Sequence, residues 1–337
     1  MLSLYASWSA YADDSCSPGN FMKTFRVFLA LAVLAIRALA VETAIVTWPT
    51  KSASPPVVFP QEQSQLLPLV RFGVAAFPEA MVMQMTFVGA SALGLSDASA
   101  AKLHQLVTAK YDTISRDPVF SKLPSALPYC YAPKQPETGQ ALIVIPERLT
   151  EDTTTIVFLH GSGGSFTFYA HFLANAFPDC LVVCPAYGET CGNIPTRYLE
   201  ECRDAVAKRT GLRPRMAPIL IGLSGGGFGG FREYCRNSRT YSGYICIAAY
   251  PPSSTLGSLP QRGHIRLIAG GAEPYVVDGT LGRGEVLLRR RVGDYDSHLV
   301  AGEDHFFLLS KEEETQAFLQ KWVSEFRKGA EVREQRK

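Results

Sequence analysis

The sequence predicts an α/β protein in which a mainly parallel, twisted β-sheet is flanked by helices and preceded by a helical extension. From Pro128 onward, short β-rich runs alternate with helical patterns, the rhythm of a parallel sheet wrapped by helices. Within that region, the apolar run at 219–221 leads through a glycine-rich turn into a helical pattern that includes Phe228 and Phe231. The rest of the chain is organised around this order of strand, tight turn and helix.

Composition sets the broad class. The chain has 337 residues, of which 47% are hydrophobic and 19% charged, so a globular protein with one large or two smaller domains is expected. The formal net charge is +2, and no basic stripe is interleaved with aromatic residues. We interpret the three arginines at 289–291 as a solvated helix face rather than a nucleic-acid patch, and no nucleic-acid partner is predicted.

The first 40 residues have the parts of a secretory signal peptide. Lys23 and Arg26 form a basic region, an apolar run follows at 27–36, and Ala-Leu-Ala at 38–40 resembles a cleavage site. The apolar run is too short to span a bilayer, and a buried helix is the alternative. The preceding residues do not resemble a basic region, so we take Met22 as the true start. This segment predicts a secreted or periplasmic protein.

Residues 41–127 form a separate N-terminal segment in this interpretation. Several prolines between 49 and 60 indicate an extended stretch. The apolar stretch at 66–95 is interrupted by Arg71, Pro78 and Glu79, which favours a pair of helices over a stable membrane span. A more evenly amphipathic helix is expected to start at Ser96. This segment is a candidate to cover the active site, because the loop at 250–262 is too short for a lid domain.

The α/β domain is expected over 128–328, followed by a polar tail at 329–337 that frays. Seven strands are predicted, at 141–145, 155–159, 180–184, 219–221, 244–249, 264–269 and 297–300. The most clearly marked helices are predicted at 166–177, 196–210 and 313–326, besides the one that follows the glycine-rich turn.

The glycine-rich turn carries a candidate nucleophile. Residues 222–226 read Gly-Leu-Ser-Gly-Gly and fit the pattern G-x-S-x-G, with Ser224 at its centre. Glycines on either side let strand and helix pass closely, while the serine is held in a strained backbone conformation with its hydroxyl exposed. The alternative is a glycine-rich turn with an incidental serine. The strand before and the helix after favour the nucleophile.

Four features together resemble the α/β-hydrolase superfamily over about Pro128 to Phe326. A His-Gly-Ser-Gly-Gly loop follows an early strand, the G-x-S-x-G turn comes next, and then come a strand and turn for an acid and a loop for a histidine. The order serine, acid, histidine is the one this fold uses. These features lie at 160–164, 222–226, 267–274 and 302–305.

The resemblance implies a role for each of these residues in acyl transfer. Ser224 is the expected nucleophile and His305 the base that takes its proton. A carboxylate must orient the histidine and stabilise its cation, and Glu273 is the expected acid, with Asp278 as the backup. A solvated turn carboxylate is the alternative for either acid. The remaining histidines are assigned to structural or surface positions: His104, His160, His171, His264 and His298.

The developing oxyanion needs two fixed N–H donors. Gly225 is expected to supply one and Ser162 the other. A phosphate-binding loop is the rival interpretation of the glycines at 161–164, but the stretch lacks the lysine and trailing hydroxyl of a P-loop and fails the dinucleotide pattern at Phe166. No Cys-x-x-Cys pair or His/Cys cluster has zinc-ligand spacing, so no cofactor and no metal are predicted.

The eight cysteines give one further expectation. Cys191 and Cys202 flank a loop and the start of a helix, so they are the expected disulfide partners in an oxidising compartment. Three others lie in apolar strand-like runs, where cysteine behaves as a small hydrophobe.

These observations predict a secreted serine hydrolase that cleaves small-molecule or lipid-like esters through an acyl-enzyme. Three alternatives stay open. The first is a serine peptidase of the same fold, and the second is a non-catalytic member that binds ligands. The third is a membrane-anchored interaction protein that uses the apolar stretch at 66–95.

Overall fold

The computed structural model describes residues 41–334, except 62–63, 89–95 and 262. The predicted signal peptide at 1–40, including the proposed start at Met22, lies outside the described residues.

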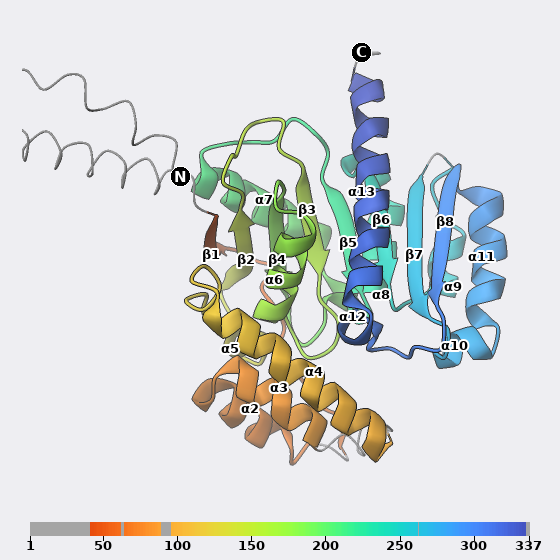
Figure 1. The fold of residues 1–337 in the computed structure, drawn as a ribbon. Helices are drawn as coiled ribbons and strands as arrows, with labels where there is room; N and C mark the ends of the chain where they lie inside the picture. Colours follow the sequence, from red (N-terminus) through yellow and green to blue (C-terminus); the bar gives the residue numbers. More distant parts are fainter. Residues whose placement is uncertain (1–40, 62–63, 89–95, 262, 335–337) are drawn as a thin grey trace, which may run out of the picture. The chain divides into compact units, whose positions relative to one another are not determined.

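A single mixed sheet of eight strands forms the centre of the described chain, in the order β1-β2-β4-β3-β5-β6-β7-β8 (Figure 1). β2 runs antiparallel to both β1 and β4, and every later pair is parallel. The predicted mainly parallel sheet is therefore confirmed. The strands are β1 (Glu42–Pro49), β2 (Thr138–Ile145), β3 (Thr155–Leu159), β4 (Leu181–Ala186), β5 (Ile219–Leu223), β6 (Gly243–Ile247), β7 (His264–Gly270) and β8 (Asp294–Val300).

Helices cover both faces of this sheet (Figure 1). The α-helices are α2 (Leu67–Ala76), α3 (Glu79–Val88), α4 (Asp97–Arg116), α5 (Leu127–Cys130), α6 (Thr167–Ala176), α7 (Thr196–Thr210), α8 (Gly225–Asn237), α9 (Ser253–Leu256), α10 (Pro274–Val277), α11 (Thr280–Arg291), α12 (Phe307–Ser310) and α13 (Glu312–Glu334). Two short 3-10 turns, η3 (Cys191–Asn193) and η4 (Ser238–Thr240), complete the order.

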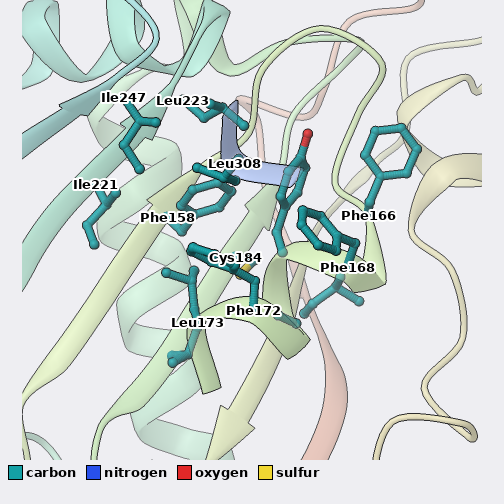
Figure 2. Packing of buried hydrophobic residues seen from close by; sticks show 14 of the residues in the cluster. Phe158, Phe166, Phe168, Phe172, Leu173, Cys184, Ile221, Leu223, Ile247 and Leu308 are labelled. Atoms are coloured by element: carbon teal, nitrogen blue, oxygen red, sulfur yellow. The ribbon is translucent and has the colours of Figure 1, made fainter. Parts of the chain in front are cut away.

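Two apolar layers result from the period of the strands. Ile219 and Ile221 of β5 face the layer under α4, α6 and α13, whereas Leu220 faces the layer under α7, α8 and α11. Strands buried on both faces read as continuous apolar runs, which is why β5 was recognised in the sequence. Figure 2 shows part of the first layer, in which Leu308 of α12 joins Phe158 and Leu223.

The N-terminal segment differs from its prediction in one respect. The expected pair of helices forms as α2 and α3, and Ser96 caps α4 by accepting a hydrogen bond from the Ser99 N–H. The stretch before them, however, contains β1, which pairs with β2 from Glu42 opposite Ile145 to Pro49 opposite Thr138. The sheet therefore includes residues on both sides of the predicted boundary at 127/128. Within the described residues, no helix is both long and apolar enough to cross a bilayer.

The C-terminal helix is longer than predicted. α13 continues to Glu334, through most of the stretch expected to fray as a polar tail. Lys328, Ala330 and Glu331 are polar or small but have high helix propensity, so loss of the apolar pattern did not mean loss of helix.

Candidate active site

Ser224 occupies the sharp turn between β5 and α8. Its backbone has φ +52° and ψ −118°, a conformation that L residues rarely adopt, and its N–H donates to the Ile247 carbonyl at 2.8 Å. The flanking glycines are required by space. A Cβ on Gly226 would lie 2.2 Å from the Leu159 carbonyl oxygen, and one on Gly222 would lie 2.4 Å from the Gly226 carbonyl oxygen. The predicted strained turn is present.

Three side chains that lie far apart in the sequence meet at this turn. The Ser224 Oγ lies 2.9 Å from His305 Nε2. His305 Nδ1 lies 3.1 Å and 3.0 Å from the two carboxylate oxygens of Glu273. With the proton on Nδ1, the imidazole donates to Glu273 and accepts from the Ser224 hydroxyl. Glu273 is 2% exposed, whereas the His305 side chain is 40% exposed and open toward solvent.

The ends of two neighbouring parallel strands deliver these partners. Glu273 follows β7 and His305 follows β8, so both leave the sheet at the carboxyl edge where ligands of parallel sheets gather. A Cβ on Gly270 would lie 2.4 Å from the Asp304 carbonyl oxygen, so a glycine is needed for the two loops to approach. Just after His305, Leu308 is buried with Leu223 (Figure 2) and fixes the loop against the core.

Asp278, the backup acid, lies elsewhere. It is exposed at the end of α10, and its carboxylate accepts a hydrogen bond from the Thr280 N–H at 2.7 Å. Hydrogen bonding from Thr280, first from its side chain and then from its N–H, holds the pKa of Asp278 below its usual value. The structure therefore brings Glu273, and not Asp278, to His305.

The loop after β3 lies directly against Ser224. A Cβ on Gly161 would lie 3.5 Å from Ser224 Oγ, and a Cβ on Gly225 would lie 3.7 Å from the Ser162 backbone nitrogen. Gly225 is also the first residue of α8, where backbone N–H groups are unpaired and favour negative charge. The two predicted donors, Ser162 and Gly225, are thus neighbours beside the candidate nucleophile.

His160 holds this loop in place as a neutral side chain. Its Nδ1–H donates to the Gly161 carbonyl at 2.9 Å, and its Nε2 accepts from the Tyr187 N–H at 3.1 Å. Burial lowers the pKa of His160 to about 4, so it stays uncharged near neutral pH. Two other histidines pair with acids away from the site, His264 with Asp294 and His298 with Glu314.

Thr190 is a residue of the site that the sequence analysis did not predict. A Cβ on Gly225 would lie 2.0 Å from Thr190 Oγ1, so this hydroxyl lies next to one predicted oxyanion donor. Thr190 also caps η3 by accepting from the Gly192 N–H at 3.3 Å. Only its position just after β4, at the same sheet edge, would have pointed to it.

A cavity of about 530 Å³ is lined by residues of α8, of the segment 250–256 and of α11. Its inner wall includes Phe228, whose N–H donates to the Ser224 carbonyl at 3.2 Å. Most of the lining is apolar or aromatic, with two arginines. The lining residues are Phe228, Arg232, Tyr250, Pro251, Pro252, Ser253, Leu256, Thr280, Arg283, Gly284 and Leu287.

The predicted disulfide is absent. All cysteines of the described residues are free thiols, including Cys191 and Cys202. Both were expected near the surface, but both are buried in the apolar layer under α7 and α8. The Cys191 thiol points to the Pro185 carbonyl oxygen, 3.8 Å away. Burial raises the pKa of each thiol well above its usual value.

Three observations decide the fold. They are the strand order, the strained turn at Ser224 after β5, and the positions of Glu273 after β7 and His305 after β8. The chain has the α/β-hydrolase fold. Within the described residues, no group of His, Cys, Asp and Glu side chains has the arrangement of a metal site.

Comparisons with known proteins add solved structures alone, since no protein-family model and no curated protein sequence matches. The chain is similar to a CIB-like hydrolase from Thermoplasma acidophilum at 15% identity, covering 55% of this chain and 92% of that one, with a TM-score of 0.44. It is also similar to naproxen esterase from Bacillus subtilis at 13% identity, covering 55% of this chain and 88% of that one, with a TM-score of 0.41. A third similar structure is a lipase in its open form, at 13% identity, covering 56% of this chain and 95% of that one, with a TM-score of 0.45.

Proposed function

We propose that this protein is a serine hydrolase that cleaves carboxylic esters through an acyl-enzyme on Ser224. The observation that carries the proposal is the hydrogen-bonded series from Ser224 through His305 to buried Glu273, at the end of a strained strand-to-helix turn. The alternative, an incidental serine in a solvated turn, does not explain why an imidazole is hydrogen-bonded to its hydroxyl and a carboxylate to that imidazole.

The first half of the reaction acylates the serine. His305 Nε2 takes the Ser224 hydroxyl proton as Oγ attacks the ester carbonyl carbon. The carbonyl oxygen gains negative charge, which the N–H groups of Ser162 and Gly225 are placed to stabilise. The C–O bond of the leaving alcohol then breaks, and His305 Nε2–H protonates the leaving oxygen. His305 keeps its Nδ1 proton throughout, and Glu273 accepts the hydrogen bond from it and stabilises the imidazolium.

The second half releases the acid. A water molecule gives its proton to His305 Nε2 and attacks the acyl carbon. The bond to Ser224 Oγ breaks, the serine regains its proton, and a carboxylic acid leaves. The steps need only these side chains, backbone N–H groups and water.

The cavity beyond α8 supports a substrate with an apolar portion. Phe228, Tyr250 and Leu256 give this cavity aromatic and aliphatic surface, and Phe228 lies one helical turn after Ser224 in α8. We therefore extend the proposal to small-molecule or lipid-like esters. The leader-like segment at 22–40 supports export, and we place the enzyme outside the cytoplasm on that basis.

The test is Ser224→Ala, assayed with p-nitrophenyl esters of increasing acyl length beside peptide anilides. Loss of the nucleophile removes the covalent route, so ester turnover should fall by roughly 10⁴- to 10⁶-fold. A fluorophosphonate should label the wild-type protein on Ser224. Ser258→Ala, a substitution at an exposed serine, is the matched control. Residual turnover above about a tenth of wild type, or labelling of another residue, would contradict the assignment.

A further inference from the structure

A second buried carboxylate lies outside the serine–histidine–glutamate series. Glu79 is the first residue of α3 and is 8% exposed. Its Oε1 accepts from the Tyr111 hydroxyl at 2.7 Å and from the Thr167 N–H at 2.6 Å. Its Oε2 accepts from the Ser125 hydroxyl at 2.5 Å and from the Thr167 hydroxyl at 3.2 Å. One side chain therefore joins α3 to α4, to the segment before α5 and to α6.

The four donors differ in one respect that matters. The hydroxyls of Tyr111, Ser125 and Thr167 can rotate and find other acceptors, but the Thr167 N–H is fixed by the backbone. It belongs to the first residue of α6, where N–H groups have no partner within the helix. Glu79 supplies that partner from another helix. Burial raises the pKa of Glu79, which its four hydrogen bonds oppose.

Besides His160, two further supports of the loop after β3 depend on this carboxylate. Thr167 follows the loop directly on the α6 side. On the other side, Gly164 has φ +105°, and a Cβ there would lie 3.1 Å from Leu127 and from Cys130 of α5. The Leu127 N–H in turn donates to Ser125 Oγ at 3.2 Å, and Ser125 donates to Glu79.

We propose that Glu79 is a positioning residue for the loop that carries the Ser162 N–H. The inference rests on the proposed function, because it assigns Ser162 to the oxyanion. Stabilisation of an oxyanion requires donors about 2.7–3.1 Å from the developing charge, so a small displacement of the loop removes much of the effect. Glu79 also gives the N-terminal helices a role in the reaction, since its carboxylate links α3 and α4 to the first residue of α6.

The first experiment compares Glu79→Leu with Glu79→Gln. Leucine leaves the Thr167 N–H without an acceptor, whereas glutamine keeps an oxygen for it and lets the hydroxyls rotate. We expect Glu79→Leu to lower kcat by at least about tenfold with KM within about threefold, since the donor acts on the transition state. Glu79→Gln should stay within about threefold of wild type in both.

A second pair of variants keeps the carboxylate and changes its partner. Thr167→Pro removes both the backbone N–H and the hydroxyl that donate to Glu79, so its comparison with Thr167→Val isolates the N–H. Proline suits the first position of a helix, and Phe166 before it is already extended at φ −86° and ψ 147°. Thr167→Val removes the hydroxyl and keeps the N–H. We expect a kcat loss in Thr167→Pro close to that of Glu79→Leu and a clearly smaller one in Thr167→Val.

Tyr111→Phe separates positioning from stability, because it removes a donor on α4, which does not border the loop. Hydrogen–deuterium exchange of the peptide 161–167 gives a readout that needs no turnover. Exchange there should rise in Glu79→Leu and stay at the wild-type level in Tyr111→Phe. Glu79→Leu that is only less stable, with normal kcat and normal loop exchange, would overturn the inference. Wild-type protein without ester turnover would sink the proposed function, while the exchange result would still decide whether Glu79 holds the loop.

Discussion

Two buried glutamates allow a direct comparison between the helical N-terminal segment and the carboxyl edge of the sheet. Glu79 is 8% exposed and Glu273 is 2% exposed. Glu79 accepts from three hydroxyls and one backbone N–H, whereas Glu273 accepts from the imidazole of His305. The side chain and its burial are nearly the same in the two regions. The hydrogen-bond donors that contact the two carboxylates are different.

The difference lies in what the partner does with a proton. Hydroxyls and peptide N–H groups do not become cations near neutral pH, so Glu79 can only fix positions. An imidazole gains a proton readily in that range, and the carboxylate beside it then stabilises a charge that appears during the reaction. A buried carboxylate thus becomes part of a chemical step through its partner rather than through its burial.

The largest expected effect comes from Glu273→Gln. An amide neither enforces the tautomer of His305 nor stabilises its cation, so kcat should fall by about 10⁴-fold with substrate binding nearly intact. Steady-state kinetics on the best p-nitrophenyl ester would measure this. A loss of less than about tenfold would remove the distinction between the two glutamates.

Asp278→Asn is the matched control for that variant, because it neutralises an exposed carboxylate on the same loop. We expect kcat within about twofold of wild type, in keeping with the small effects of surface substitutions. The reverse ranking of the two variants would transfer the role of the acid to Asp278.

A smaller effect, on stability, is expected for Tyr111→Phe. Loss of a buried hydrogen bond to a carboxylate should lower the free energy of unfolding by about 1.5–3 kcal/mol. Urea unfolding followed by circular dichroism would measure it. Unchanged stability would mean that the other three donors satisfy Glu79 by themselves.

The most delicate comparison uses pH. Burial raises the pKa of folded Glu79 above its unfolded value of about 4.3, so the folded state keeps this proton to higher pH than the unfolded chain. Its favourable contribution is present below about pH 4 and is lost as the pH rises through the folded pKa. Wild type should therefore lose stability relative to Glu79→Gln as the pH is raised from about 4 toward neutral. Unfolding of both proteins across that range would show it, and a change of the opposite sign would mean that the four donors outweigh burial.

Much of the site followed from local sequence signals. Ser224 was marked by its glycines and by the apolar strand before them. Glu273 and His305 each follow a recognisable strand, and the parallel arrangement predicts that such ends meet at one edge.

Features fixed by distant contacts did not show in the sequence. Glu79 looked like an interruption of an apolar stretch, and its partner Thr167 lies 88 positions away. β1 was hidden because prolines follow it closely and its partner strand comes much later in the chain. Burial of Cys191 and Cys202 depends in the same way on α7 and α8 packing over them, which loop signals do not report.

The place of β1 has a consequence for the order in which the chain matures. Of the described strands β1 is made first, yet Glu42 has no strand partner until Ile145 has been made, after the whole helical segment. Closing that long connection is slow compared with forming helices, so α2–α5 have time to fold while β1 waits as an unpaired strand. An unpaired strand is a template for pairing with other chains. Completion of β2 therefore gives β1 a partner along one side, while its other side remains the edge of the sheet.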